Sequence, residues 1–143
     1  MNPAEPPAPG TIFRYAYLWS HEQQRGQEEG LKDRPALVLA VAVSASKVAA
    51  LAITHSPPQN QDEAIALPRS VKKALGLDNQ DSWVVLTEAN VFTWPGPDLR
   101  NIPGAEPPTA IYGRIPSDLM QVIAQRTLDM RNRRRMRFIS RTE

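Results

Sequence analysis

The chain has 143 residues, of which 41% are hydrophobic and 22% charged, and its formal net charge is +2. This balance is ordinary for one globular domain. Because cysteine is absent, disulfides, thiolate zinc sites and cysteine nucleophiles are excluded. No apolar run approaches the roughly 20 residues of a membrane-spanning helix. The proline-rich residues 1–9 do not resemble a signal peptide. We therefore expect a cytoplasmic protein with no membrane contact, in which residues 1–9 form a disordered lead-in.

The first half of the chain predicts three strands. Residues 11–19 are rich in β-branched and aromatic side chains, which is typical of a strand. Residues 36–43 and 48–54 are short apolar runs on either side of a turn, so they predict a buried hairpin. Residues 20–33 are polar and contain two glycines. They predict a long loop, and loops of this length are often functional.

The second half predicts shorter elements. We expect strands at residues 64–67, 82–87 and 109–115, and a short helix at residues 69–75 that Gly76 ends. Residues 94–104 contain three prolines and two glycines, so they predict a turn-rich excursion.

Pro116 sets the backbone for the first turn of a final helix. Its apolar side chains recur at helical spacing and predict one buried stripe, made of Leu119, Val122, Ile123, Thr127 and Met130. We expect this helix to fray into the arginine-rich end. The whole pattern predicts a mainly β protein with a C-terminal helix, folded as a small curled sheet or barrel.

Positive charge is concentrated at the C-terminal end. Residues 126–143 carry seven arginines against Asp129 and Glu143, whereas the rest of the chain has more acidic than basic side chains. A polyanion would be attracted to this end. We therefore treat residues 131–143 as a basic tail, and its candidate substrate-binding residues are Arg133, Arg134 and Arg135.

Two positions could form a phosphate clamp. Arg34 stands at the entrance of the first hairpin strand and Thr54 at the exit of the second. A hairpin has its entry and exit at one end, so the two side chains would be neighbours. An arginine fork grips a phosphate through two hydrogen bonds, and a threonine hydroxyl can add a third. The alternative is a solvated arginine beside an ordinary strand threonine.

The same segments carry a family resemblance. The run GTIFRYAYLW, the pattern Gly26-x-Glu28-x-Gly30, and the runs RPALVL and VAALAIT resemble the first half of PemK/MazF toxins. The run IYGRIPSDLMQVI resembles the family's last strand, proline and C-terminal helix. The resemblance covers about residues 10–130. It implies an SH3-like small β-barrel in this range, a homodimer, a cognate antitoxin partner, and cleavage of single-stranded RNA without a metal or other cofactor.

The resemblance also implies site residues. The family's arginine and threonine, which are thought to carry RNA cleavage, fall on Arg34 and Thr54, and its loop glutamate falls on Glu28. Metal-free cleavage uses the ribose 2′-hydroxyl as nucleophile and requires a base, an acid and positive charge at the phosphate. Arg34 suits the role of the positive charge at the phosphate, and Thr54 would orient a phosphate oxygen. Glu28 is the first candidate for the base.

Other residues remain open as candidates. His21 and His55 have suitable chemistry for proton transfer, and His55 adjoins Thr54. Glu88 matches the family's acidic position in one of two registers for the stretch SWVVLTEANVFTW. We therefore expect His55 and Glu88 to contact the substrate.

A second functional class also fits the sequence. The same barrel could bind single-stranded nucleic acid or a protein partner without catalysis. Trp83, Phe92 and Trp94 could then stack on bases, although Trp83 also fits a place in the core. An RNA cleavage assay separates the two classes.

Overall fold

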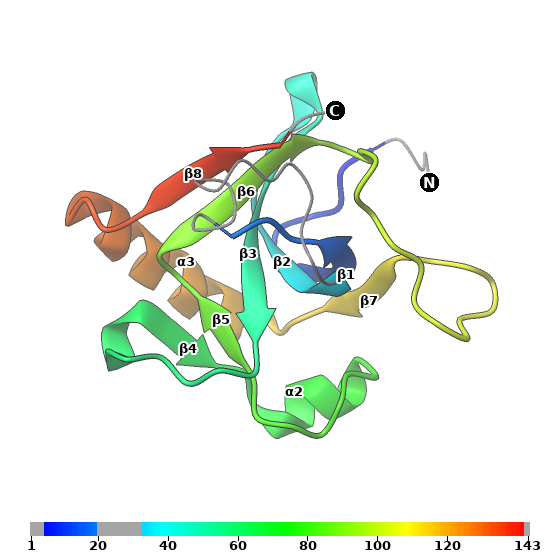
Figure 1. Cartoon of the computed structure of the whole chain (residues 1–143), viewed down its shortest axis with the longest axis horizontal. Coiled ribbons are helices and arrows are strands. Elements are labelled where there is room, and N and C mark those ends of the chain that lie inside the picture. Colours follow the sequence, from blue (N-terminus) through cyan, green and yellow to red (C-terminus); the bar gives the residue numbers. More distant parts are fainter. Residues whose placement is uncertain (1–4, 20–32, 142–143) are drawn as a thin grey trace.

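A computed structural model describes residues 5–19 and 33–141, and this part of the chain is mainly β. Figure 1 shows a curled sheet with one long helix packed on it. The strands are β1 (Thr11–Ala16), β2 (Asp33–Ala42), β3 (Lys47–Thr54), β4 (Ala64–Ala66), β5 (Trp83–Val85), β6 (Glu88–Thr93), β7 (Ile111–Arg114) and β8 (Arg137–Ser140). The helices are α2 (Arg69–Ala74) and α3 (Ser117–Asn132), with short 3-10 turns η1 (Val43–Ala45) and η2 (Gln61–Glu63).

Strand β3 lies at the centre of the sheet. The strand order is β4-β5-β3-β2-β1-β7, and β6 joins it by pairing with both β3 and β8. The N-terminal part of β3 pairs with β6, while its last two residues pair with β5. The sequence predicted one strand over residues 82–87. The structure forms β5 within this range and ends it at Val85, whereas β6, which was not predicted, begins at Glu88. The two strands pair with different parts of β3 (Figure 1).

The predicted hairpin is confirmed as β2 and β3. Ala36 lies opposite Ala52 in their antiparallel register. The hairpin turns through η1 and Ser46, which has a left-handed φ of 52°. Continuing the register toward the open end sets Arg34 opposite Thr54. The hairpin therefore brings these two residues to one edge of the sheet.

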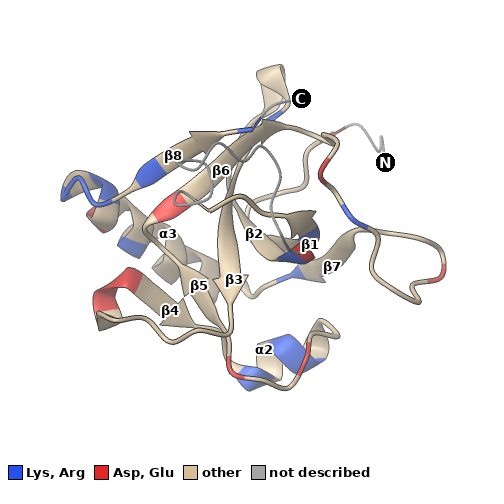
Figure 2. Ribbon diagram, viewed as in Figure 1, with Lys and Arg blue, Asp and Glu red and all other residues tan. Residues whose placement is uncertain are grey.

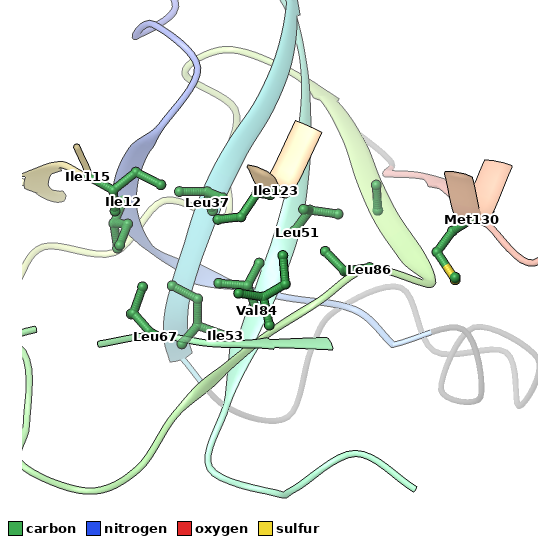
Figure 3. Packing of buried hydrophobic residues seen from close by; sticks show 12 residues of the cluster. Ile12, Leu37, Leu51, Ile53, Leu67, Val84, Leu86, Ile115, Ile123 and Met130 are labelled. Carbon is green, nitrogen blue, oxygen red and sulfur yellow. The ribbon is translucent and has the colours of Figure 1, made fainter. Parts of the chain in front are cut away.

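The strands bury both of their faces, and alternate residues enter two clusters. The first cluster includes Ile12, Leu37 and Leu51, and it packs against Ile123 and Met130 of α3 (Figure 3). The second cluster is aromatic, with Phe13, Tyr15, Tyr17, Phe92 and Trp94 in mutual contact. This alternation follows from the two-residue period of a strand.

Helix α3 confirms the predicted C-terminal helix, with one exception in its stripe. Ile123, Thr127 and Met130 are buried, and Leu119 packs against the first cluster. Val122, however, is 48% exposed. It precedes Ile123 by one residue and therefore points about 100° away from the buried side of the helix. Among the described residues, no helix has the length and apolar character needed to cross a membrane.

The arginine-rich end is folded, not frayed as the sequence suggested. After α3 the chain turns at Arg134, which has a φ of 59°, and then forms β8 parallel to β6. The side chain of Arg141 is 1% exposed and lies 2.9 Å from Asp98. The same guanidinium donates to the Ala16 carbonyl at 2.7 Å and to Asn90 Oδ1 at 3.1 Å. Residues 137–141 are thus part of the fold.

Candidate functional site

Arg34 and Thr54 form the centre of the candidate site. Both are half-buried at the open end of the β2–β3 hairpin. The Arg34 guanidinium lies 5.0 Å from the centre of the Trp19 ring, a cation–π contact that orients its plane. Thr54 Oγ1 accepts a hydrogen bond from the Ser56 backbone N–H at 3.1 Å. Because this bond uses a lone pair, the hydroxyl hydrogen of Thr54 can still be donated to a ligand.

Two cavities meet at this pair of residues. One, the β5-side cavity, has a volume of about 450 Å³ and is lined by Trp19, Arg34, Thr54, Ser56, Glu63 and Thr87, among others. The other, the α2-side cavity, has a volume of about 510 Å³, and its lining includes Arg14, Arg34, Thr54, His55, Lys72 and Asp78. Figure 1 shows the end of β3 between β4–β5 on one side and α2 on the other. A ligand bound to Arg34 and Thr54 would therefore have a cavity on either side of it.

The α2-side cavity contains a chain of charged residues. His55 Nε2 lies 2.8 Å from Asp78 Oδ2, and Asp78 Oδ1 accepts from Lys72 Nζ at 2.7 Å. Lys72 is 3% exposed and also donates to Ser82 Oγ at 2.6 Å and to the Gln80 carbonyl. Burial raises the pKa of Asp78, but the hydrogen bonds from Lys72, the Gln80 N–H and His55 outweigh it and lower the pKa. Asp78 is thereby held as a carboxylate.

The predicted tail arginines lie at the end of α3, where they meet acidic residues of η2 (Figure 2). Arg133 Nη1 is 3.4 Å and Arg135 Nη1 is 2.8 Å from Asp62 Oδ2. The hydrogen bond from Arg135 lowers the pKa of Asp62. Glu63, which lines the β5-side cavity, lies 3.7 Å from Arg135. These arginines therefore border the candidate site and do not enter it, and Arg134 is exposed beside them.

The remaining predicted residues have different outcomes. Glu28 and His21 lie outside the described residues. Glu88 begins β6 and lines neither of the two cavities. It acts instead on Tyr17, whose pKa is raised by burial and then by the charge of Glu88. The role of Glu88 in substrate contact stays a prediction.

The prediction that Phe92 and Trp94 stack on bases is wrong. Phe92 is 1% and Trp94 is 6% exposed, because both belong to the aromatic cluster of the core. Neither can stack on a base without unfolding part of the sheet. Trp83 is half-buried in β5. Trp19 is the aromatic residue that lines the β5-side cavity, and sequence reasoning had read it only as the end of a strand.

Sequence reasoning also missed Lys72 and Asp78. Lys72 is on α2 and Asp78 in the following loop, 23 positions after His55. No spacing in the sequence connects these residues. Lys72 could only have been noticed as a charged residue within the short helix, where a lysine is ordinarily solvated.

The arrangement suits an anionic ligand. A guanidinium and a hydroxyl can bind phosphate oxygens, a histidine–carboxylate pair can transfer a proton, and Trp19 offers a face for stacking.

Comparison of the chain with known proteins gave no significant match to a family model, to a curated protein or to a solved structure.

Proposed function

We propose that the protein is a metal-independent endoribonuclease that cuts single-stranded RNA at a phosphate held by Arg34 and Thr54. One observation carries the proposal: these residues face each other at the junction of two cavities, so the chain of a polymer could continue on both sides of a bound phosphate. A sealed pocket for a small metabolite would not need two such extensions. The resemblance to PemK/MazF toxins supports the same reading.

The proposed reaction is an internal transfer. The ribose 2′-oxygen attacks the neighbouring phosphorus, the bond from phosphorus to the 5′-oxygen breaks, and the products are a 2′,3′-cyclic phosphate and a 5′-hydroxyl. Arg34 donates to the non-bridging oxygens as negative charge builds on them, and it stays protonated throughout. Thr54 adds one hydrogen bond. Its oxygen accepts a hydrogen bond from the Ser56 N–H, and its hydroxyl hydrogen can be donated to the phosphate.

The two cavities would hold the nucleotides that flank the cut. Trp19 presents an aromatic face in the β5-side cavity, and stacking on such a face contributes about 1–3 kcal/mol per base. The contact with Arg34 keeps the Trp19 ring beside the clamp. The α2-side cavity has a more charged lining, with Arg14, Lys72 and Asp78. The difference between the two linings provides a basis for selecting the RNA sequence.

The type of barrel, the homodimer and the antitoxin partner are part of the same proposal. We take the curled sheet to be an SH3-like barrel of the PemK/MazF type, which is supported by the pairing of β3 with three strands. The working unit would be a homodimer, and a cognate antitoxin would cover the RNA site to control growth inhibition. Sedimentation at micromolar concentration should give twice the chain mass of 15.9 kDa, and a clean monomer would count against the dimer.

The test is incubation of the protein with a long RNA transcript in the presence of EDTA. Fragments that carry 2′,3′-cyclic phosphate and 5′-hydroxyl ends at a recurring sequence support the proposal. If the protein binds the RNA but leaves it intact, the result would favour the alternative, a non-catalytic domain that binds single-stranded nucleic acid through Arg34 and Trp19.

A further inference from the structure

We propose that His55 is the general base of this reaction and that Asp78, fixed by the buried Lys72, positions it. The inference rests on the proposed function and assigns the proton transfer to His55, whereas the resemblance points to Glu28. His55 and Asp78 line the α2-side cavity together with Arg34 and Thr54. The pair therefore faces the phosphate clamp from the side on which the chain leaves β3.

The hydrogen bond between the pair selects one form of the ring. Asp78 Oδ2 lies 2.8 Å from His55 Nε2, and an ionised carboxylate can only accept a hydrogen bond. Nε2 therefore carries the hydrogen, which leaves the lone pair on Nδ1. Nδ1 is the atom that takes the proton from the 2′-hydroxyl, and the carboxylate then stabilises the imidazolium that forms.

Lys72 holds the Asp78 carboxylate in a fixed position. A buried ammonium is costly unless it is fully paired, and Lys72 meets this need through Asp78, Ser82 and the Gln80 carbonyl. The Gln80 backbone N–H donates to Asp78 Oδ1 at 3.1 Å, so this oxygen accepts two bonds. The other oxygen, Oδ2, is directed at His55. A lysine on a short helix thus orients a carboxylate, which in turn orients the histidine.

Other charged groups share the cavity with His55. Within residues 5–19 and 33–141, they are Arg14 on β1, Asp33 and Arg34 on β2, Lys72 on α2, and Asp78 in the loop, with Tyr112 on β7. Asp33 is paired with Arg14 at 3.6 Å and with Arg100 at 3.5 Å. In the part of the chain that the structure describes, Asp78 is thus the carboxylate in hydrogen-bond contact with His55.

The step balances in protons and electrons. The 2′-hydroxyl loses its proton to His55 Nδ1 while the oxygen forms a bond to phosphorus. The electron pair of the breaking bond goes to the 5′-oxygen, which takes a proton from water. No oxidant or reductant takes part, and His55 returns to its starting form when it releases the proton to solvent.

The experiment measures single-turnover cleavage across a pH series, with an RNA oligonucleotide that spans a mapped cut. Wild type should show a rate that rises with pH as the base loses its proton. His55→Ala should lower the rate by about 100-fold or more, because a positioned base contributes roughly 10²–10⁴-fold. It should also flatten the rising limb, and added imidazole should restore part of the rate. The His55 side chain is 50% exposed, so its removal should leave the fold intact.

Asp78→Asn tests the positioning role. It should lower the maximal cleavage rate while KM stays unchanged, because the ring loses the carboxylate that orients it. Asp81→Asn is the matched control, since Asp81 is an exposed carboxylate paired with Arg69 at 2.8 Å and lies outside the cavity lining. It should behave as wild type.

The outcomes separate the two proposals. A His55→Ala protein that cleaves at the wild-type rate, or that is slower but keeps the rising limb, overturns the assignment of His55 and leaves the endoribonuclease proposal standing. Absence of cleavage by wild type overturns both. A flattened limb in His55→Ala, with an unaffected Asp81→Asn, supports the pair.

Discussion

The Arg141 guanidinium lies 2.9 Å from the Asp98 carboxylate in the interior of the protein, where the two side chains are 1% and 8% exposed. This ion pair joins the end of the chain to the excursion between β6 and β7. Arg141 also stacks over the Tyr15 ring at 5.3 Å and donates to Tyr15 Oη at 3.2 Å. The C-terminal arginine therefore connects β8 with the aromatic core cluster.

Replacing Arg141 should destabilise the fold strongly. Arg141→Met leaves the Asp98 charge buried without its partner, and breaking such a pair costs about 3–5 kcal/mol. Urea unfolding followed by tryptophan fluorescence measures the loss. Arg137→Met is the matched control in the same strand, because Arg137 is exposed, and it should change the free energy of unfolding by less than about 0.5 kcal/mol. Equal effects of the two variants would contradict the structural role of Arg141.

Asp78 should make stability depend on acid pH. Its pKa is lowered from 3.8 in the folded protein, so its contribution is present above pH 3.8 and is lost as pH falls through the folded value. Asp78→Asn should unfold more easily at pH 7, by about 1–3 kcal/mol, because the buried Lys72 loses a charged partner. Its stability should also decline less than that of wild type below pH 4. Urea unfolding between pH 2.5 and 7 checks both effects, and parallel curves for the two proteins would contradict them.

The hairpin and the helix were predictable because their signals are local. Apolar runs on either side of a turn specify β2 and β3, and the position of Arg34 opposite Thr54 follows from antiparallel pairing. Strand β8 was not predicted, because the arginines around Phe138 and Ile139 indicated a solvated tail. It joins the sheet by pairing with β6 and burying Ile139, and Asp98, far away in sequence, accepts the charge of Arg141.

Only part of the candidate site could be predicted from the sequence. The clamp residues follow from the hairpin, but the contact between His55 and Asp78 depends on how α2 and its loop pack beside β3. The burial of Lys72 also depends on this packing and could not be predicted from the sequence. Its burial reflects three partners in the loop after α2, and no local pattern indicates that a helix lysine is turned inward.

The arginines at the end of α3 should add attraction to RNA that does not depend on sequence. Replacing both Arg133 and Arg134 with Gln should reduce the slope of log affinity against log salt by roughly 1.4, about 0.7 for each phosphate contact. Arg135 is kept because it is half-buried and holds Asp62 of η2. A non-cleavable 2′-deoxy oligonucleotide in a salt titration measures the slope.

The control for this titration is Lys47→Gln, a charge change at the opposite end of β3 from Thr54. It should leave the salt slope at the wild-type value. Identical slopes for wild type and the double arginine variant would show that the end of α3 does not touch RNA. Deletion of the whole segment is a poor test, because it would remove β8 and the buried Arg141 as well.

The central claim is that the Arg34 fork stabilises the phosphate during cleavage. The most direct measurement is the single-turnover cleavage rate of Arg34→Lys in EDTA, compared with wild type and with Arg137→Lys, a matched change at an exposed arginine. Lysine keeps the charge but loses the two parallel hydrogen bonds. We predict a rate at least tenfold lower for Arg34→Lys, by analogy with the roughly 2.7–4 kcal/mol that loss of one transition-state donor costs, and a wild-type rate for Arg137→Lys. Cleavage by Arg34→Lys at the wild-type rate, with the same cyclic phosphate ends, would contradict the account.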